Sequence, residues 1–295
     1  MRSGDEETVA KLELTVAFEL GKEAGVFCPT CTAANLAALL ALGERGRAAV
    51  LEADAHVHVA EGGGISELAG LRPFSIAAAT PDEVEAAVIT REAALVCLEN
   101  THTRSGGRVL DVAATAGAAA AAHKHGARVH LDGARLVNAA AALAVDVGEL
   151  TAPVDTVAVS LNKGLCAPYG AVLAGDPATI TTAREHLNRL GAGTVHKAGV
   201  LAAAGLVAWE RMRSRLGEDH ERARRLAELL DLPAPETNIV MTELPASALP
   251  DLERRGVLAF APGGGNIRLV THRGISDEDV DEAAAALTRF GIPGR

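Results

Sequence analysis

Short, continuously apolar runs alternate along this sequence with longer alanine-rich stretches. Five such runs lie at residues 48–51, 94–98, 128–131, 156–159 and 170–174. Because each run is apolar throughout instead of alternating with polar residues, it is typical of a strand buried on both faces of a parallel sheet. The stretches between the runs, such as residues 82–90 and 112–125, have helical character. The alternation therefore predicts an α/β fold with a mostly parallel sheet and right-handed crossovers.

The C-terminal part of the sequence has a different pattern. It predicts a long helical region at residues 197–230, strands at 236–242 and 266–270, a short helix at 250–255 and a further helix at 277–290. Ser276 precedes three acidic residues, which is a favourable start for a helix. We expect a large domain, a connecting helix and a small C-terminal α+β domain, at residues 1–205, 206–230 and 231–295.

Charge and composition exclude several classes of partner. The net charge is −10 and aromatic residues make up only 2% of the chain. A nucleic-acid or anionic-membrane surface needs a basic footprint, so we expect no nucleic acid and no membrane partner. No apolar run is long enough to span a bilayer, and residues 1–7 contain no apolar signal region, so we expect neither a spanning segment nor a secretory leader. We therefore expect a cytoplasmic protein.

A C-x-x-C pair at Cys28 and Cys31 is open to two chemical interpretations. Such a pair is either a redox dithiol or half of a zinc site. No second pair of cysteines or histidines follows at the spacing of a zinc finger. We therefore expect no metal, and keep a zinc or redox role as the less favoured alternative.

Polar residues follow the apolar runs at the point where each predicted strand ends. Asp132 and Arg135 come after one run, Lys163 after another, and His56 after a third, while Thr32 precedes a helical stretch. In an open parallel sheet, ligands bind beyond the carboxyl ends of the strands. The sequence therefore predicts that these side chains share one site.

Pyridoxal phosphate suits this set of residues. The cofactor needs a lysine for its aldehyde and an acid for its ring nitrogen. Its phosphate suits a helix N-terminus, where backbone N–H groups favour an anion, and the substrate carboxylate suits an arginine. Lys163, Asp132, Thr32 and Arg135 could supply these parts.

The sequence resembles the low-specificity L-threonine aldolases, in the β-eliminating-lyase group of fold type I pyridoxal-phosphate enzymes. The matching segments include LENTH and HLDGAR and lie, in the family's order, at residues 98–102, 106–110, 130–135, 163–168, 198–205, 236–238 and 268–272. The resemblance implies an aspartate-aminotransferase-like large domain, a small amino-acid substrate and a homodimer or homotetramer. Relative to the family, the sequence has a shortened N-terminus.

The resemblance also implies roles around the cofactor. Lys163 matches the lysine that forms the Schiff base, and Asp132 matches the partner of the ring nitrogen. His56 matches the histidine that stacks on the ring. Thr32 and Cys31 match the phosphate cup, although the family usually has glycine in place of Cys31.

The remaining implied roles concern the substrate. Arg135, close to the cofactor, and Arg268 match the ligands of the substrate carboxylate, and His102 matches a second histidine near the β-hydroxyl group. The implied reaction is retro-aldol cleavage of a β-hydroxy-α-amino acid to glycine and an aldehyde. The general base is left open between His56, His102 and a water held by either. There are two alternatives to this aldolase activity. One is a β-eliminating or specialised biosynthetic lyase, and the other is a catalytically weak paralogue.

Overall fold

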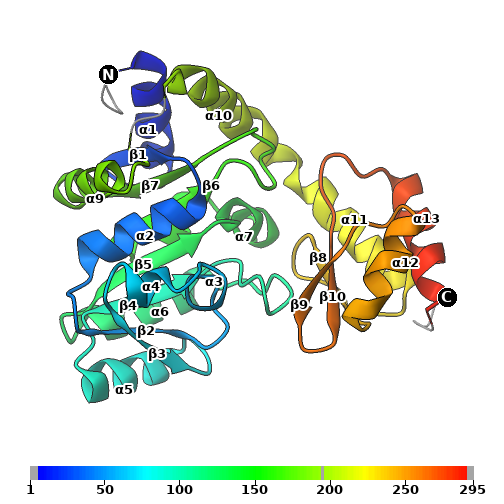
Figure 1. Cartoon of the computed structure of the whole chain (residues 1–295), viewed down its shortest axis with the longest axis horizontal. Coiled ribbons are helices and arrows are strands. Elements are labelled where there is room, and N and C mark those ends of the chain that lie inside the picture. The colour runs from blue at the N-terminus through cyan, green and yellow to red at the C-terminus, as the bar shows by residue number, and fades with distance from the viewer. Residues whose placement is uncertain (1–5, 194–195, 291–295) are drawn as a thin grey trace. The chain divides into compact units, whose positions relative to one another are not determined.

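The computed structural model describes residues 6–193 and 196–290, which form two compact units (Figure 1). The larger unit comprises Met1–Thr101 and Leu110–Arg213, and the smaller one His102–Val109 and Ser214–Arg295. None of the helices in the described part of the chain is long and apolar enough to cross a membrane.

The larger unit is built on a seven-stranded sheet with the order β1-β7-β6-β5-β4-β2-β3. Its strands are β1 (Ala24–Cys28), β2 (Ala48–Glu52), β3 (Arg72–Ile76), β4 (Leu95–Glu99), β5 (Arg128–Gly133), β6 (Thr156–Ser160) and β7 (Ala171–Gly175). The five apolar runs correspond to β2 and β4–β7, and the residues of β2, β4, β6 and β7 are all buried. The mostly parallel sheet confirms the predicted α/β class.

One predicted strand direction is wrong. The apolar run at residues 170–174 was expected in the parallel part of the sheet, but β7 runs antiparallel to both of its neighbours, β1 and β6. Two parallel neighbours need a crossover of about a dozen residues or more, usually a helix. The short connection from β6 to β7 contains no described helix. The apolar pattern therefore predicted that this strand is buried, but it did not predict the direction of the strand.

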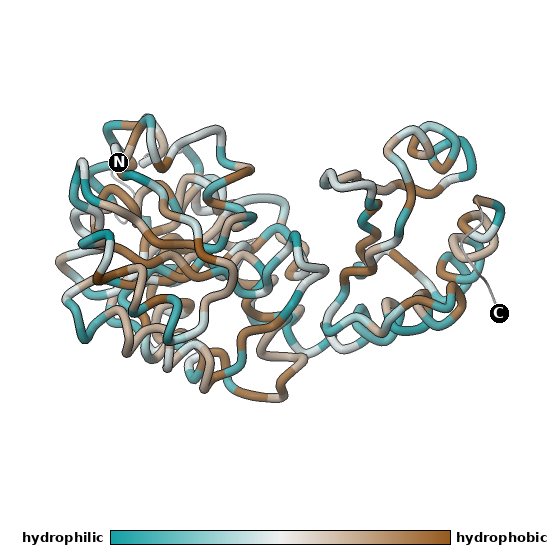
Figure 2. The backbone as a smooth tube through the Cα atoms, turned by 90° about the horizontal axis from the view of Figure 1, so that it is seen from below, coloured by the Kyte–Doolittle hydropathy of each residue, from teal (hydrophilic) through white to brown (hydrophobic). Residues whose placement is uncertain are grey.

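Ten helices are described in the larger unit. They are α1 (Glu7–Glu19), α2 (Cys31–Leu42), α3 (His56–Val59), α4 (Gly64–Glu67), α5 (Pro81–Arg91), α6 (Val112–His123), α7 (Leu136–Leu143), α8 (Val147–Thr151), α9 (Pro177–Arg189) and α10 (Ala198–Met212). In Figure 2 the central strands of this unit are hydrophobic and most hydrophilic segments lie around them.

Helix α2 positions the functional site. Thr30 caps its N-terminus, with the Thr30 hydroxyl oxygen accepting the N–H of Ala33 at 3.0 Å. Ala34, Ala37 and Ala38 are fully buried in a cluster with small residues of β6 and β7. Small side chains let the helix lie close on the sheet. The N-terminus of α2 therefore comes to the edge at which β5 and β6 end.

The smaller unit contains a three-stranded antiparallel sheet with the order β8-β10-β9. Its elements are α11 (Leu216–Leu229), β8 (Ile239–Glu243), α12 (Leu249–Arg254), β9 (Phe260–Gly263), β10 (Asn266–Val270) and α13 (Asp277–Thr288). Ser276 caps α13 as predicted, because its side chain accepts the N–H of Asp279 while the Asp279 carboxylate accepts the N–H of Ser276. The predicted helical region at residues 197–230 is interrupted by a 3₁₀ turn at Arg213–Arg215.

The loop His102–Val109 is part of the smaller unit, although it lies between β4 and α6 in sequence. Arg104 donates to the carbonyl of Pro262 at 2.7 Å, and Thr237 donates to the carbonyl of Gly107 at 3.2 Å. Gly107 has φ +81° and lies against the Thr237 hydroxyl, so a side chain at this position would collide with it. Only glycine allows this close approach.

Candidate active site

A cavity of about 220 Å³ lies in the larger unit where the N-terminus of α2 meets the carboxyl ends of β5 and β6. It is lined by Thr30, Cys31, Thr32, Asn35, His56, Asp132, Ala134, Ser160, Asn162 and Lys163. Five side chains singled out from the sequence thus lie around one cavity: Thr32, Cys31, His56, Asp132 and Lys163. Most of the lining residues are polar, and polar groups that converge on one cavity are what fix the orientation of a bound ligand.

Asp132 is the buried acid of this cavity. It is only 2% exposed and lies near the end of β5. One of its carboxylate oxygens accepts the amide Nδ2 of Asn35 at 2.9 Å, and the other accepts the backbone N–H of Ala134 at 3.1 Å. A buried carboxylate is stable when it accepts such hydrogen bonds. These two bonds also fix the orientation of the carboxylate.

Asn35 connects Asp132 to a second buried polar chain. Its Nδ2 donates to Asp132 and to Glu61, each at 2.9 Å, which assigns Oδ1 as the acceptor. Oδ1 lies 3.0 Å from Nε2 of His130, and Nδ1 of His130 lies 2.9 Å from the Thr156 hydroxyl. Burial lowers the pKa of His130 to about 4, so the ring is neutral. His130 therefore carries its proton on Nε2 and donates it to Asn35.

His56 is held at two points by carboxylates. Its backbone N–H donates to Glu99 at 2.7 Å, and its Nδ1 lies 3.0 Å from the Glu61 carboxylate. The hydrogen bond to Glu61 raises the pKa of His56. Burial raises the pKa of Glu61, and its hydrogen bonds to His56 and Asn35 act against that rise. These contacts fix both the position and the ring orientation of His56.

Lys163 and the start of α2 complete the cavity. Lys163 is half-buried in the loop that follows β6, next to Asn162, whose side-chain oxygen accepts the Ser160 hydroxyl at 2.7 Å. The first turn of an α-helix presents backbone N–H groups that have no partner within the helix, and Cys31 and Thr32 occupy this turn of α2. The cavity thus combines an amine with an anion-binding helix end.

Both thiols of the C-x-x-C pair favour the protonated form. Burial raises the pKa of Cys28 to about 12. The pKa of Cys31 is raised well above its usual value by burial and then by the Asp132 carboxylate, 4.0 Å from its Sγ. Because redox exchange and zinc binding both use the thiolate, this environment offers no support for either role.

The donor set fits pyridoxal phosphate. Asp132 offers a buried carboxylate for a ring N–H, Lys163 offers an amine, and the N-terminus of α2 offers N–H groups and the hydroxyl of Thr32 for a phosphate. Cys31, which stands where the family usually has glycine, lies on the wall of the cavity beside Asp132. The group His56, Glu61 and Asp132 also brings ligand atoms within 4.8 Å of one another. Because Asn35 donates to both carboxylates, we keep the expectation of no metal.

Three predicted residues are not among the described residues that line this cavity. Arg135 is the N-cap residue of α7 and is half-buried. It is not one of the described residues that line the cavity. His102 and Arg268 belong to the smaller unit. His102 is buried with Nδ1 2.9 Å from the Ser105 hydroxyl, and Arg268 lies in β10 with its guanidinium 5.0 Å from the centre of the Phe260 ring. Their roles toward a substrate stay predictions.

Sequence reasoning missed Asn35, Glu61 and Glu99 as site residues. Glu99 ends a strand and was visible as a strand-end polar residue. Asn35 lies one turn into α2, and Glu61 follows a short helix, so neither is marked by a strand end. Gly62, Gly63 and Gly64, directly after Glu61, were the available signal for a tight turn at this point.

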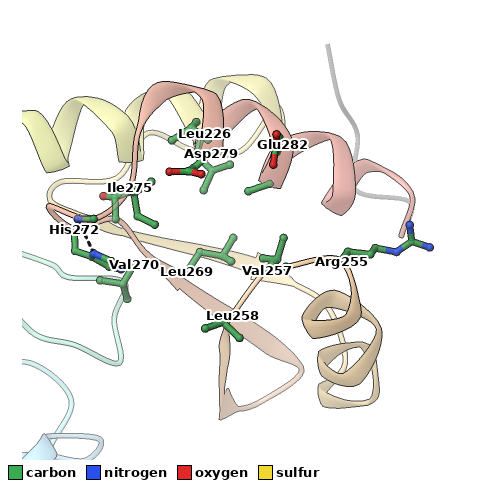
Figure 3. Close-up of a pocket in the computed structure, with 15 residues that line it drawn as sticks. Leu226, Arg255, Val257, Leu258, Leu269, Val270, His272, Ile275, Asp279 and Glu282 are labelled. Carbon is green, nitrogen blue, oxygen red and sulfur yellow. Dashed lines mark hydrogen bonds between the residues drawn. The ribbon is translucent and has the colours of Figure 1, made fainter.

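A second cavity of about 370 Å³ lies within the smaller unit, between α13, β10 and the segment before β9 (Figure 3). Much of its wall is aliphatic, with Leu226, Val257 and Leu269 among the labelled residues. Two of its polar side chains are used internally, because Asp279 accepts the N–H of Ser276 at the start of α13 and Thr271 donates to the carbonyl of Asp219. This cavity lacks the combination of amine, buried acid and helix N-terminus found in the larger unit.

Comparison with known proteins identifies similar chains over most of this sequence. The profile of the family described as "Beta-eliminating lyase" matches residues 2–245. A probable low-specificity L-threonine aldolase 2 from Arabidopsis thaliana is 37% identical, covering 94% of this chain and 86% of the relative. A low specificity L-threonine aldolase from Escherichia coli is 35% identical, covering 97% and 90%.

Solved structures resemble the fold. A putative L-allo-threonine aldolase from Listeria monocytogenes superposes with a TM-score of 0.83 at 22% identity, covering 98% of this chain and 88% of the other. At this identity the similarity concerns the fold alone.

Proposed function

The chain belongs to the beta-eliminating lyase family, and from this premise we propose that it is a pyridoxal-phosphate-dependent aldolase. It cleaves a β-hydroxy-α-amino acid of the L-threonine or L-allo-threonine type to glycine and an aldehyde. The observation that carries the proposal is the meeting of Lys163, Asp132 and the N-terminus of α2 in one cavity. Relatives named as low-specificity L-threonine aldolases support the choice of substrate.

The residues of the cavity would hold the cofactor at three points. Lys163 would bond to its aldehyde carbon, and Asp132 would accept the ring N–H. The backbone of Cys31 and Thr32 would hold the phosphate at the start of α2. When bound, pyridoxal phosphate supplies a ring that accepts the electron pair left on Cα when the Cα–Cβ bond breaks.

The chain itself must supply a base for the substrate. In the cleavage, the β-hydroxyl group loses its proton, its C–O bond becomes the carbonyl of the aldehyde, and Cα gains a proton to give glycine. His56 lines the cavity beside Lys163, and an imidazole is the side chain whose pKa lies nearest neutrality. We assign the removal of the β-hydroxyl proton to His56. Arg135 and Arg268 stay the proposed ligands of the substrate carboxylate, with His102 near the β-hydroxyl.

The proposal predicts aldehyde release by the purified protein supplied with pyridoxal phosphate. L-threonine, L-allo-threonine and L-phenylserine are incubated separately, and glycine and the aldehyde are measured together, with D-threonine as the control. Equal amounts of both products from at least one L-substrate support the proposal. Absence of cleavage of all three contradicts it, and pyruvate with ammonia from a β-chlorinated alanine would point to β-elimination.

We also propose that the catalytic form is a homodimer or homotetramer. Helices α1 and α10 pack together in the larger unit, and both expose apolar side chains. Phe18 is 82% exposed and Val200 73%, and Leu14 and Val207 are also exposed. A second copy of the chain would remove these side chains from water.

Replacing Phe18 by aspartate should therefore shift the protein toward the monomer without unfolding it. Burying the added charge in an interface is unfavourable, whereas on a free surface it costs little. Light scattering coupled to size-exclusion chromatography measures the change in mass, and circular dichroism confirms folding. Ile89→Asp, at an exposed apolar position on α5, is the control. An unchanged mass for Phe18→Asp would contradict this interface.

A further inference from the structure

We propose that Glu61 is a positioning residue that holds His56 in the tautomer with its proton on Nδ1, so that the pair acts as one proton-accepting unit. The inference deepens the proposed function and rests on it for its catalytic part. Glu61 was not singled out from the sequence, and its role follows from its contacts in the larger unit.

The contacts of Glu61 specify which nitrogen of His56 carries the proton. One carboxylate oxygen, Oε1, lies 3.0 Å from Nδ1 of His56 and accepts Nδ2 of Asn35 at 2.9 Å. An ionised carboxylate is only an acceptor, so Nδ1 of His56 must be the donor in this bond. Nε2 is then the nitrogen without a proton. It is the atom of His56 left to accept one from a substrate in the cavity.

Asn35 keeps Glu61 in place, and its hydrogen bond favours the ionised form of the Glu61 carboxyl. The Glu61 side chain is only 4% exposed, whereas that of His56 is 34% exposed. Burial is the largest cause and raises the pKa of the Glu61 carboxyl, whereas the hydrogen bonds from His56 and Asn35 to Oε1 lower it. Asn35 also donates to Asp132. The same amide therefore fixes both Asp132, the proposed partner of the ring nitrogen, and Glu61, which holds His56.

The charged groups around His56 come from four elements, and they act in both directions. Glu61 follows α3, Asp132 lies on β5, and both raise the pKa of His56, with the Glu61 hydrogen bond as the largest cause. Lys163, after β6, lowers it, as does burial. Glu99, on β4, contacts the backbone N–H of His56. Glu61 is therefore the group whose removal should change the basicity of His56 most.

Two substitutions separate the geometry of Glu61 from its charge. Glu61→Gln keeps an oxygen that accepts from Asn35 and His56 but removes the charge. Glu61→Ala removes both. Glu67→Gln is the matched control. Glu67 is exposed and lies nearby on α4, and the substitution removes the same charge as Glu61→Gln.

The first readout needs no cofactor. Long-range ¹H–¹⁵N spectra of the cofactor-free protein report the tautomer and pKa of His56, whose signal among the ten histidines is assigned by its loss in His56→Asn. We expect a proton on Nδ1 in the wild type and in Glu61→Gln, with a lower pKa in Glu61→Gln. Glu61→Ala should populate both tautomers. A His56 pKa and tautomer that are unchanged in both variants would overturn the proposal.

The second readout is the pH profile of aldol cleavage by the protein loaded with pyridoxal phosphate. Glu61→Gln should lower kcat by about 10-fold to 100-fold, since general base catalysis contributes about 10²–10⁴-fold in all. Its acid limb should move to lower pH, because the folded pKa of the base falls. In a His56→Asn background, Glu61→Gln should have little further effect, whereas additive losses would show that Glu61 does not act through His56.

The two readouts distinguish failure of the proposed function from failure of the role proposed for Glu61. If the wild type cleaves no aldol substrate, the proposed function fails, and the spectra still decide whether Glu61 sets the state of His56. If the wild type cleaves and Glu61→Gln retains the wild-type pH profile and kcat, the function stands and the role of Glu61 is wrong.

Discussion

Lys163→Ala should abolish both the covalent attachment of pyridoxal phosphate and aldol cleavage. Among the described residues, one lysine lines the cavity that contains Asp132, His56 and the start of α2, so no other described amine on its wall can replace Lys163. Loss of a nucleophile that forms the covalent bond typically costs on the order of 10⁴-fold or more in rate. We therefore expect kcat to fall by at least that order, with the fold intact.

Borohydride reduction followed by intact-protein mass spectrometry measures the attachment directly. Reduction should fix one cofactor per chain on the wild type and none on Lys163→Ala. Lys124→Ala is the control, because Lys124 is exposed on the C-terminal end of α6 and pairs with Glu85. Equal cofactor incorporation in Lys163→Ala and the wild type would rule out Lys163 as the attachment site.

Asp132→Asn should lower kcat/KM by on the order of 10³-fold, which is the scale of losing one directed electrostatic contact in a closed site. The charge that would keep the ring nitrogen protonated is lost. The new side chain has one acceptor oxygen in place of two, so its N–H₂ must face either Nδ2 of Asn35 or the backbone N–H of Ala134, both of which donate to Asp132 in the wild type. If Asn35 turned to accept, its bond with Nε2–H of His130 would break. We therefore also expect a loss of stability of about 1–3 kcal/mol, the cost of an unsatisfied buried group.

Steady-state kinetics and urea unfolding check the two effects separately. Asp82→Asn, on the exposed first turn of α5, removes the same charge and should leave both quantities near the wild-type values. In Asp132→Ala, a pyridoxal phosphate methylated on the ring nitrogen should restore part of the activity, because its positive charge is permanent. An Asp132→Asn variant with wild-type kcat/KM would remove Asp132 from the cofactor site.

Much of the larger unit could be predicted because strands buried on both faces have continuously apolar sequences. The run at residues 128–131 is apolar throughout since β5 lies in the middle of the sheet, with β4 and β6 as neighbours. Its last residues, with Lys163 after β6, were expected at a common edge because parallel strands end together. The edge strand β3 is half-exposed and contains Pro73, so it has no continuous apolar run and was not predicted.

The partners of the site residues could not be predicted, because they are set by contacts between distant segments. Asn35 and Asp132 are 97 residues apart, and His56 and Glu99 are 43 apart. Each contact depends on how α2 and α3 pack on the sheet, and a local pattern does not encode that packing. The direction of β7 was missed for a related reason, since burial is the same for a strand running either way.

The loop His102–Val109 has a consequence for exchanging parts between relatives. Its bonds to Thr237, Glu236 and Pro262 are all made with the C-terminal segment. The smaller unit is thus assembled from two stretches of sequence, with residues 110–213 between them. A chimera that exchanges only the residues after Arg213 would join a foreign sheet to the native loop. A recombination experiment should therefore transfer residues 102–109 and 214–295 as one block, because they pack together within one unit.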